Sequence, residues 1–460
     1  MSSKIGHRIE PKTRPPEIRK KDFEEVELTL SPEEAMKEAS RDIKFCAAPC
    51  STRGCPVNVN VNGFLKKVAE GDFKEAYRIL IQNTPIPSIT GRVCQQEIQC
   101  EGACVLRRVG EPIAIGAVER FVGDWALDNN VEIPVTVEKK NKKVAVVGSG
   151  PSGIVAAADL ARMGYDVTMF EAFHVPGGVL AYGIPEFRLP KRILRKEFER
   201  LQNIGVDIEL GVVVGTTYTI PELLKDYDAV FLGVGAGRPM FLNVPGENLA
   251  GIYTANEFLT RVNLMKSYMF PEYDTPIHVG KKVAVIGAGN TAMDAARSAL
   301  RLGADVYIIY RRGRNEVTAR AVEFRHAEEE GVKTIFWATP IEFQSSDGVN
   351  VSNIKLMKMK PGEPDRTGRP RPVPTGETFD FETDMVITAI GFYPNPLIPQ
   401  MTPELKVDDH GRVVVDLEGR TSIPHVYAGG DIVTGESTVI EAMGWGRRVA
   451  RTIDKDLQKI

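Results

Sequence analysis

The sequence has 460 residues, of which 43% are hydrophobic and 26% are charged, and its formal net charge is −3 at pH 7. These values are typical of a folded chain of two or three domains and exclude global disorder. The near-neutral charge gives no support for a nucleic-acid or anionic-membrane partner, and no apolar run is long enough to span a bilayer. The first residues carry no apolar signal-peptide core, so we expect a cytoplasmic location.

The first 40 residues begin as a polar, proline-rich segment and then become helical. Ser31 and Pro32 are followed by two glutamates. Ser is a favoured N-cap residue and Pro is favoured at the first helical position, so we predict a helix that begins at Pro32. From residue 41 to about residue 130, the pattern predicts short helices joined by loops that carry cysteines.

All six cysteines lie between Cys46 and Cys104. A disulfide framework is unusual in a large chain without a secretion signal, whereas clustered cysteines are typical of an intracellular metal site. No histidine lies in this segment, which argues against a mixed Cys/His zinc site. Thiolates are the usual ligands of iron–sulfur clusters, and we favour clusters over zinc. The cysteines form two groups, Cys46-x3-Cys50-x4-Cys55 and Cys94-x5-Cys100-x3-Cys104.

A charged stretch at residues 138–143 predicts a linker, after which the composition changes sharply. Two short apolar strands, at residues 143–147 and 282–286, each lead into a glycine-rich turn, an alanine-rich helix and a further strand. Repeated β-α-β units of this kind are typical of doubly wound nucleotide-binding domains. We therefore predict an α/β fold with two dinucleotide-binding domains after a mostly helical N-terminal domain. Residues 366–375, rich in Pro and Gly, predict a surface loop.

The first glycine-rich turn is a complete G-x-G-x-x-G motif. Its glycines allow a tight turn, close approach of the backbone to a pyrophosphate, and close packing of helix on strand. Glu171 follows at the end of the next strand, near the spacing expected for a carboxylate that binds ribose hydroxyls. The predicted dinucleotide-binding residues are Gly148, Gly150, Pro151, Ser152, Gly153 and Glu171.

The second turn, Gly287-Ala288-Gly289-Asn290-Thr291-Ala292, has alanine at the third glycine position, as the motif allows. Where a ribose-binding carboxylate would follow, the sequence has Tyr310, Arg311 and Arg312. Guanidinium groups bind a 2′-phosphate through charge-assisted hydrogen bonds, so we predict NADP(H) in this domain. A solvated basic turn is the alternative. The predicted site residues are Gly287, Gly289, Asn290, Thr291, Arg311 and Arg312.

With NADP(H) assigned to the second turn, we predict FAD at the first. Residues 426–431 and 438–446 resemble the closing segment of flavoproteins of the glutathione-reductase class. In that class an Asp contacts the flavin's ribityl–phosphate region, and the next helix directs its N-terminus at the isoalloxazine ring. A glycine-rich turn before an ordinary helix is the alternative. The resemblance assigns FAD contacts to Gly430, Asp431, Thr438, Val439 and Ile440. No cysteine follows Cys104, so thiol–disulfide chemistry is not expected.

Several strings along the chain look like the motifs of one protein family. They are Gly54-Cys55-Pro56-Val57, Gly91-Arg92-Val93-Cys94, Gln99-Cys100-Glu101-Gly102-Ala103-Cys104, and residues 115–121, 176–190 and 255–260. Together they resemble a family of flavin and iron–sulfur proteins that contains the small subunit of glutamate synthase, the large subunit of NADH-dependent ferredoxin:NADP oxidoreductase, archaeal sulfide dehydrogenase and the N-terminal half of dihydropyrimidine dehydrogenase. The resemblance begins at about Ser31 and is closest to the ferredoxin:NADP oxidoreductase and sulfide dehydrogenase branch.

The resemblance implies a helical iron–sulfur domain over residues 1–140. It implies a FAD-binding domain in two parts, residues 141–265 and 385–460, as in glutathione reductase. An NADP-binding domain over residues 266–384 lies between these parts. The glycine-rich string in residues 176–190 places Gly178 at the flavin.

For the cysteine region, the resemblance implies two clusters with interleaved ligands. Cys55, Cys94, Cys100 and the carboxylate of Glu119 would hold a four-iron cluster near the flavin. Taken by itself, Glu119 has the pattern of a solvated residue on an amphipathic helix over residues 115–127. Its position in the family string favours the ligand role.

The second cluster would use Cys46, Cys50 and Cys104. The family has a further cysteine just before Cys46, and this sequence has none there. We therefore expect a three-iron cluster, or a four-iron cluster with an oxygen ligand for which Asp42 is the leading candidate.

These assignments imply an NAD(P)H-dependent iron–sulfur flavoprotein oxidoreductase. Its cofactors would be FAD, NADP(H) and the two clusters, which supply the redox chemistry, and we assign no catalytic acid or base. Electrons would pass to or from ferredoxin or a second flavin/iron–sulfur subunit, with electron bifurcation as one version of this activity. Two alternatives stay open: a glutamate synthase small subunit that supplies NADPH electrons, and a non-catalytic electron-transfer scaffold. The intact second turn argues against the scaffold.

Overall fold

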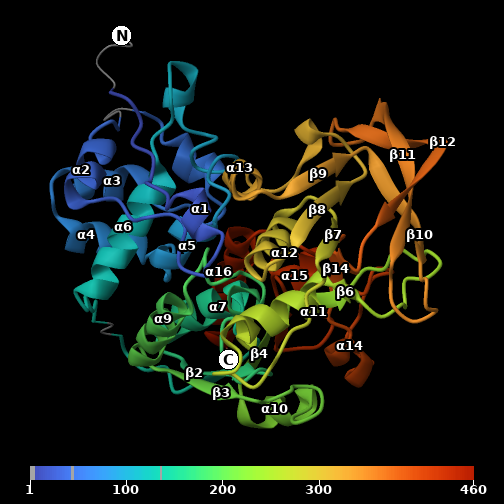
Figure 1. Ribbon diagram of the computed structural model, residues 1–460. Helices are drawn as coiled ribbons and strands as arrows, with labels where there is room; N and C mark the ends of the chain where they lie inside the picture. The colour runs from blue at the N-terminus through green and yellow to red at the C-terminus, as the bar shows by residue number, and fades with distance from the viewer. Residues whose placement is uncertain (1–5, 43–45, 135–136, 460) are drawn as a thin grey trace.

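Residues 6–42, 46–134 and 137–459 are described by a computed structural model, in which one helical region lies beside two α/β regions (Figure 1). The blue and cyan helices of the N-terminal region group on one side of the view. The green elements and the yellow and orange elements form the two α/β regions. The red C-terminal helix α16 (Val439–Leu457) packs against α7 (Pro151–Arg162) in the first α/β region and against α5 (Pro87–Val93) in the helical region. The last helix therefore returns to the middle of the molecule.

The capped helix predicted to begin at Pro32 is confirmed as α2. The Ser31 hydroxyl accepts a hydrogen bond from the Glu34 backbone N–H at 3.2 Å, and the Glu34 carboxylate accepts one from the Ser31 N–H at 2.9 Å. This reciprocal capping satisfies two N–H groups that the first turn leaves free. The helices are α1 (Pro16–Arg19), α2 (Pro32–Ala39), α3 (Val61–Ala69), α4 (Phe73–Leu80), α5 (Pro87–Val93) and α6 (Ile115–Asp128), with a π-helical turn at Cys50–Gly54 and a 3₁₀ turn at Val105–Arg108.

Helices α5 and α6 pack closely because glycine occupies their crossing point. A Cβ atom on Gly91 would lie 2.5 Å from the backbone nitrogen of Arg120, too close for any other residue. Helix α6 begins where the pattern predicted, but most of its residues are buried rather than one face alone. This packing holds the end of α5, where Cys94 follows, against the middle of α6, where Glu119 lies.

The first α/β module is a five-stranded parallel sheet in the order β15-β4-β1-β2-β3. The C-terminal strand β15 pairs with β4 and completes it. The strands are β1 (Lys143–Val147), β2 (Asp166–Glu171), β3 (Val206–Leu210), β4 (Ala229–Leu232) and β15 (Val426–Ala428), and the helices are α7 (Pro151–Arg162), α8 (Val179–Tyr182), α9 (Lys191–Asn203), α10 (Ile220–Asp226), α14 (Leu397–Met401), α15 (Asp431–Thr434) and α16.

The second α/β module repeats this plan with a parallel sheet in the order β6-β13-β7-β8-β9. Its strands are β6 (Ile252–Thr254), β7 (Lys282–Ile286), β8 (Asp305–Tyr310), β9 (Lys333–Phe336) and β13 (Met385–Thr388). Its helical segments are α11 (Ala255–Leu259), α12 (Asn290–Arg301) and α13 (Ala321–Glu330), with short turns at Thr260–Leu264, Ser267–Met269 and Arg314–Glu316.

A three-stranded antiparallel sheet extends from the second module, formed by β10 (Ala338–Gln344), β11 (Asn353–Pro364) and β12 (Pro370–Glu382) (Figure 1). The prediction of a loop over residues 366–375 is therefore wrong for residues 370–375, because β12 begins at Pro370. The turn between β11 and β12 is short. Proline fits here because β12 has a neighbour on one side only, in the order β10-β11-β12. A further two-stranded sheet joins β5 (Ala236–Pro239) and β14 (Phe392–Pro394).

Strand pairing extends the second module beyond the predicted range of residues 266–384. Strand β6 lies before that range and β13 lies after it, yet both belong to the second sheet. Sequence alone did not show this, because neither short strand carries a glycine-rich turn. Within residues 6–42, 46–134 and 137–459, no helix has the length and apolar content that crossing a membrane requires.

Candidate functional site

A cavity of about 430 Å³ opens between the two α/β modules. Both glycine-rich turns reach it: the first contributes its loop and the start of α7, and the second contributes the first turn of α12. The predicted residues that line it are Gly148, Gly150, Pro151, Ser152, Glu171, Gly178, Asn290, Thr291, Asp431, Thr438 and Val439. Gly153, Gly287 and Gly289 belong to the two turns, and Gly430 directly precedes Asp431, but none of these four glycines lines the cavity.

The first turn is covered by the segment that carries Gly178. This glycine has φ 53°, and a Cβ atom on it would lie 2.8 Å from the Cα of Gly150. Only glycine combines that backbone conformation with so close an approach. Gly178 therefore sets the segment from residue 176 directly on the first glycine-rich turn.

Glu171 lies buried at the end of β2, beside the first turn. Its carboxylate accepts hydrogen bonds from the Ser149 N–H at 3.1 Å, from the Ser149 hydroxyl, and from the Phe173 N–H at 2.9 Å. These bonds fix the carboxylate at the cavity wall. Ser149 was not predicted, although its place between two motif glycines was a usable signal.

The C-terminal segment supplies a partly buried carboxylic acid, Asp431, and a helix N-terminus. Burial raises the pKa of Asp431 to about 6, and the Ser437 hydroxyl, which donates a hydrogen bond at 2.5 Å, opposes that rise. Helix α16 begins after Thr438, whose hydroxyl caps it by accepting a hydrogen bond from the Glu441 N–H. The positive end of the helix dipole therefore points toward the cavity.

Cys55, Cys94, Cys100 and Glu119 line one small pocket on the other side of α16, together with Ile440. Residues 6–42, 46–134 and 137–459 contain no group of three or more Cys, His, Asp or Glu side chains that converges on a single ion. The four donors instead surround a common space, an arrangement that suits a multi-iron cluster.

The solvated role for Glu119 is wrong, because only 7% of the residue is exposed. Burial raises the pKa of its carboxyl to about 7, and the Thr90 hydroxyl, which donates a hydrogen bond to it, offsets this in part. Burial also raises the pKa of the Cys94 and Cys100 thiols well above the usual value, and Glu119 adds to both shifts. Ionising such a donor set requires a nearby positive charge, which iron would supply.

Cys46, Cys50 and Cys104, the predicted ligands of the second cluster, lie near one another. Burial raises the pKa of Cys50 to about 11, and the neighbouring Cys104 and Cys46 contribute to the rise. The Asn62 amide donates a hydrogen bond to Asp42 at 2.8 Å and another to the Cys46 sulfur at 3.5 Å. Asp42 is therefore next to the cysteine group, as its predicted role requires. Residues 43–45, where the family's further cysteine would lie, are outside the described residues.

Arg311 and Arg312 differ in their surroundings, although the sequence predicted the same role for both. Arg311 is exposed, whereas the Arg312 side chain is only 10% exposed. Arg312 Nη2 forms an ion pair with Asp365 at 2.8 Å, and no described residue hydrogen-bonds to the buried Nη1. The solvated-turn description fits Arg311 and not Arg312. Asp365 lies in the turn after β11 and was not predicted.

Two further arginines were not predicted: Arg188 joins the two α/β modules, and Arg320 joins the second module to the helical domain. Arg188, from the segment before α9, forms hydrogen bonds to both oxygens of Asp294 on α12, at 2.7 and 2.8 Å. Both residues line the cavity. Arg320, just before α13, donates hydrogen bonds to the Arg92 carbonyl and to Gln96 Oε1, on either side of Cys94. Their partners are far away in the sequence, so no local pattern could indicate them.

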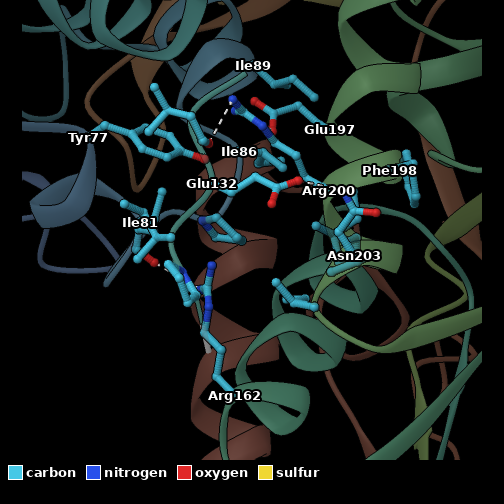
Figure 2. A pocket seen from close by; sticks show the side chains of 17 residues that line it. Tyr77, Ile81, Ile86, Ile89, Glu132, Arg162, Glu197, Phe198, Arg200 and Asn203 are labelled. Atoms are coloured by element: carbon cyan, nitrogen blue, oxygen red, sulfur yellow. Dashed lines mark hydrogen bonds and ion pairs between the residues drawn. The ribbon is translucent and has the colours of Figure 1, made fainter. Parts of the chain in front are cut away.

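A second cavity, of about 170 Å³, lies between α4 and α5 of the helical domain and α7 and α9 of the first module (Figure 2). Its walls are mostly apolar, with Glu197 and Arg200 from α9 among them (Figure 2). Burial raises the pKa of Glu197 to about 6, and the Arg200 charge opposes the rise. None of the predicted site residues lines this cavity.

Comparison with known proteins is consistent with this geometry. Residues 142–446 match the family model for the pyridine nucleotide-disulphide oxidoreductases. The chain belongs to that family. Residues 19–131 match the model described as dihydropyrimidine dehydrogenase domain II, 4Fe-4S cluster. The predicted iron–sulfur domain and dinucleotide-binding region are thereby confirmed, while the number and type of the clusters stay predictions.

The chain is 34% identical over 453 residues to the glutamate synthase [NADPH] small chain of Escherichia coli, covering 96% of each chain. It is 39% identical to the NADP(+)-dependent formate dehydrogenase subunit beta of Moorella thermoacetica, covering 90% of this chain but only 60% of that subunit. These relatives confirm the family of iron–sulfur flavoprotein NADPH oxidoreductases, whereas the branch within it stays a prediction.

Among solved structures, FprA from Mycobacterium tuberculosis in complex with NADPH has a TM-score of 0.58 and 24% identity. The match covers 69% of this chain and 85% of FprA. Thioredoxin reductase from Lactococcus lactis has a TM-score of 0.52 and 21% identity, and the match covers 70% of this chain and 100% of that enzyme. These similarities confirm the two-module fold.

Proposed function

We propose that this chain takes electrons from NADPH at the second module, receives them at FAD in the first module, and delivers them through the helical domain to a partner redox protein. The bound cofactors would supply hydride transfer and one-electron chemistry. The protein residues would bind and orient them. The observation that carries the proposal is the position of the α16 N-terminus.

Three consecutive residues at that N-terminus connect the two sites. Thr438 and Val439 line the cavity between the modules, and Ile440 lines the pocket of Cys55, Cys94 and Cys100. The Gln99 amide, beside Cys100, donates a hydrogen bond to the Thr438 hydroxyl at 3.4 Å. A flavin in the cavity and a cluster in the pocket would therefore be separated by a single turn of helix.

In the proposed site, Glu171 would accept hydrogen bonds from the ribose, the first turn and the α7 N-terminus would bind the pyrophosphate, and α16 would face the flavin ring. Arg312 would bind the 2′-phosphate of NADPH. The cluster nearer the flavin would use Cys55, Cys94, Cys100 and Glu119 as ligands.

The proximity of Cys46, Cys50 and Cys104 supports a second cluster, from which electrons would pass to the partner. Cys46, Cys50 and Cys104 would be its thiolate ligands, and Asp42 would supply an oxygen ligand. We place the protein in the cytoplasm, where the thiol ligands stay reduced. The partner would be a ferredoxin or a second flavin/iron–sulfur subunit, consistent with relatives that are named as subunits.

The test is anaerobic purification of the native complex, with flavin and iron analysis and titration by NADPH. We expect about one FAD per chain, iron in the helical domain, and flavin bleaching by NADPH ahead of NADH. A protein with bound FAD but no iron would refute the proposed electron path.

A glutamate synthase role is the second candidate, because the similarity to that small chain covers 96% of both proteins. Copurification of an amidotransferase subunit would select it. Copurification of a flavin and iron–sulfur subunit or of ferredoxin would select the first candidate.

A further inference from the structure

Arg320 joins three structural units that the proposed function uses separately. It belongs to the second module, where its backbone N–H donates a hydrogen bond to Asn290 Oδ1 at 2.9 Å. Asn290 begins α12 within the glycine-rich turn and lines the cavity between the modules. The backbone of Arg320 is thus fixed to the surface on which a dinucleotide pyrophosphate would lie.

The side chain of Arg320 extends into the helical domain, with only 10% of it exposed. Its guanidinium donates hydrogen bonds to the Arg92 carbonyl at 2.9 Å and to Gln96 Oε1 at 2.8 Å. It also pairs with Glu97 at 3.4 Å. These three partners flank Cys94 on both sides, so the cation is held against the loop that carries this thiol.

Gln96 continues the connection to the carboxylate. Its amide donates hydrogen bonds to the carbonyls of Thr90 and Gly91 at 3.3 and 3.0 Å, and its side chain lines the cysteine pocket. The Thr90 hydroxyl in turn donates to Glu119. An unbroken series of hydrogen bonds therefore runs from Asn290 through Arg320 and Gln96 to the pocket.

We propose that Arg320 is a positioning residue that couples nucleotide occupancy of the second glycine-rich turn to the redox state of the cluster beside Cys94. This inference rests on the proposed function, because it needs a cluster at that pocket. A fixed cation near a cluster stabilises its reduced, more negative form. A nucleotide that shifts Asn290 shifts the backbone of Arg320 and hence the position of its charge.

Coupling of this kind is reciprocal. If the nucleotide changes the cluster's ease of reduction, reduction of the cluster must change nucleotide affinity by the same factor. Because linkage makes the two effects equal whatever group carries the coupling, loss of both effects in an Arg320 variant is the result that assigns the coupling to this residue.

The experiment uses 2′-phospho-ADP-ribose, which has the phosphates of NADP and no nicotinamide and so cannot be reduced. Electron paramagnetic resonance would follow cluster reduction in a redox titration of the holoprotein, with and without this probe. Binding of the probe would be measured with the cluster oxidised and reduced. We expect cluster reduction to change the affinity for the probe by a factor of about ten. The probe should shift the midpoint potential of the cluster by the equivalent amount, which is 59 mV for a one-electron couple.

Arg320→Gln should abolish the nucleotide-dependent shift and lower the cluster's midpoint potential, while Arg320→Lys should restore part of both effects. Arg314→Gln is the matched control, because Arg314 lies in the same module but is exposed and pairs with Glu328 of that module. Iron content must equal that of the parent, which shows that the variant folds with its clusters.

A shift that persists in Arg320→Gln, or no shift in the parent, would overturn the coupling while leaving the proposed function intact. Absence of iron from the parent protein would instead refute the proposed function and the coupling with it.

Discussion

The two arginines after β8 give the sharpest test of nucleotide preference, because the structure predicts unequal roles for them. Removing a charge-assisted hydrogen bond costs about 1.5–3 kcal/mol when the group is buried and held in place. Arg312 meets this condition, with a side chain that is 10% exposed and an ion pair to Asp365 at 2.8 Å. Arg312→Ala should therefore lower kcat/KM for NADPH by about 10- to 150-fold.

Arg311 is exposed, and an exposed ion pair contributes only about 0.2–1 kcal/mol. Arg311→Ala should therefore lower kcat/KM for NADPH by no more than about fivefold. Neither change should alter kcat/KM for NADH, which has no 2′-phosphate. Anaerobic flavin bleaching by each nucleotide provides the assay, with Arg314→Ala as the control. Equal losses for NADPH and NADH, or a larger effect of Arg311 than of Arg312, would refute the reasoning.

Three other changes test the helical domain and the cavity between it and the first module. Glu119→Ala should remove or destabilise one cluster and leave FAD bound, because the cavity proposed for the flavin lies in the α/β modules; unchanged iron content and paramagnetic spectra would exclude Glu119 as a ligand. Asp42→Cys should convert the second cluster to an all-thiolate four-iron form with a shifted potential. About four iron atoms per chain in the parent, rather than seven or eight, would mean that no second cluster forms. Glu197→Gln tests the cavity of Figure 2, where the folded-state pKa of about 6 exceeds the ordinary 4.5. The folded state binds this proton more tightly, so the stabilisation is complete below pH 4.5 and is lost as the pH rises through 6. The difference in stability between variant and parent should change by about 2 kcal/mol across this range, as measured by melting temperature, and a constant difference would contradict it.

Local motifs explain what could be predicted from the sequence. The capped helix at Pro32 and the turns at residues 148–153 and 287–292 depend on neighbouring residues, so their patterns were sufficient. Glu171 could be placed because its distance from the first turn is set by one helix and one strand.

Features that depend on distant packing could not be predicted in the same way. The pattern of α6 indicates a solvated face, yet α2, α3, α4 and α5 surround the helix and bury Glu119. Asp365 reaches Arg312 only because β11 and β12 form a long hairpin, and a proline-rich sequence gave no sign of that hairpin. Arg320 contacts a carbonyl 228 residues earlier in the chain.

The order of strands in the first sheet has a consequence for synthesis of the protein. Strand β4 ends at Leu232, whereas its neighbour β15 begins at Val426. A ribosome adding about 5–20 residues per second needs roughly 10–40 s to make the intervening segment. During this time α7 lacks the helix that packs on it, and Asp159 lacks Arg447, its bidentate partner at 2.9 Å in the finished structure. The proposed flavin site is thus incomplete until α16 emerges, so FAD binding at this site would come late, after the second module has had time to fold.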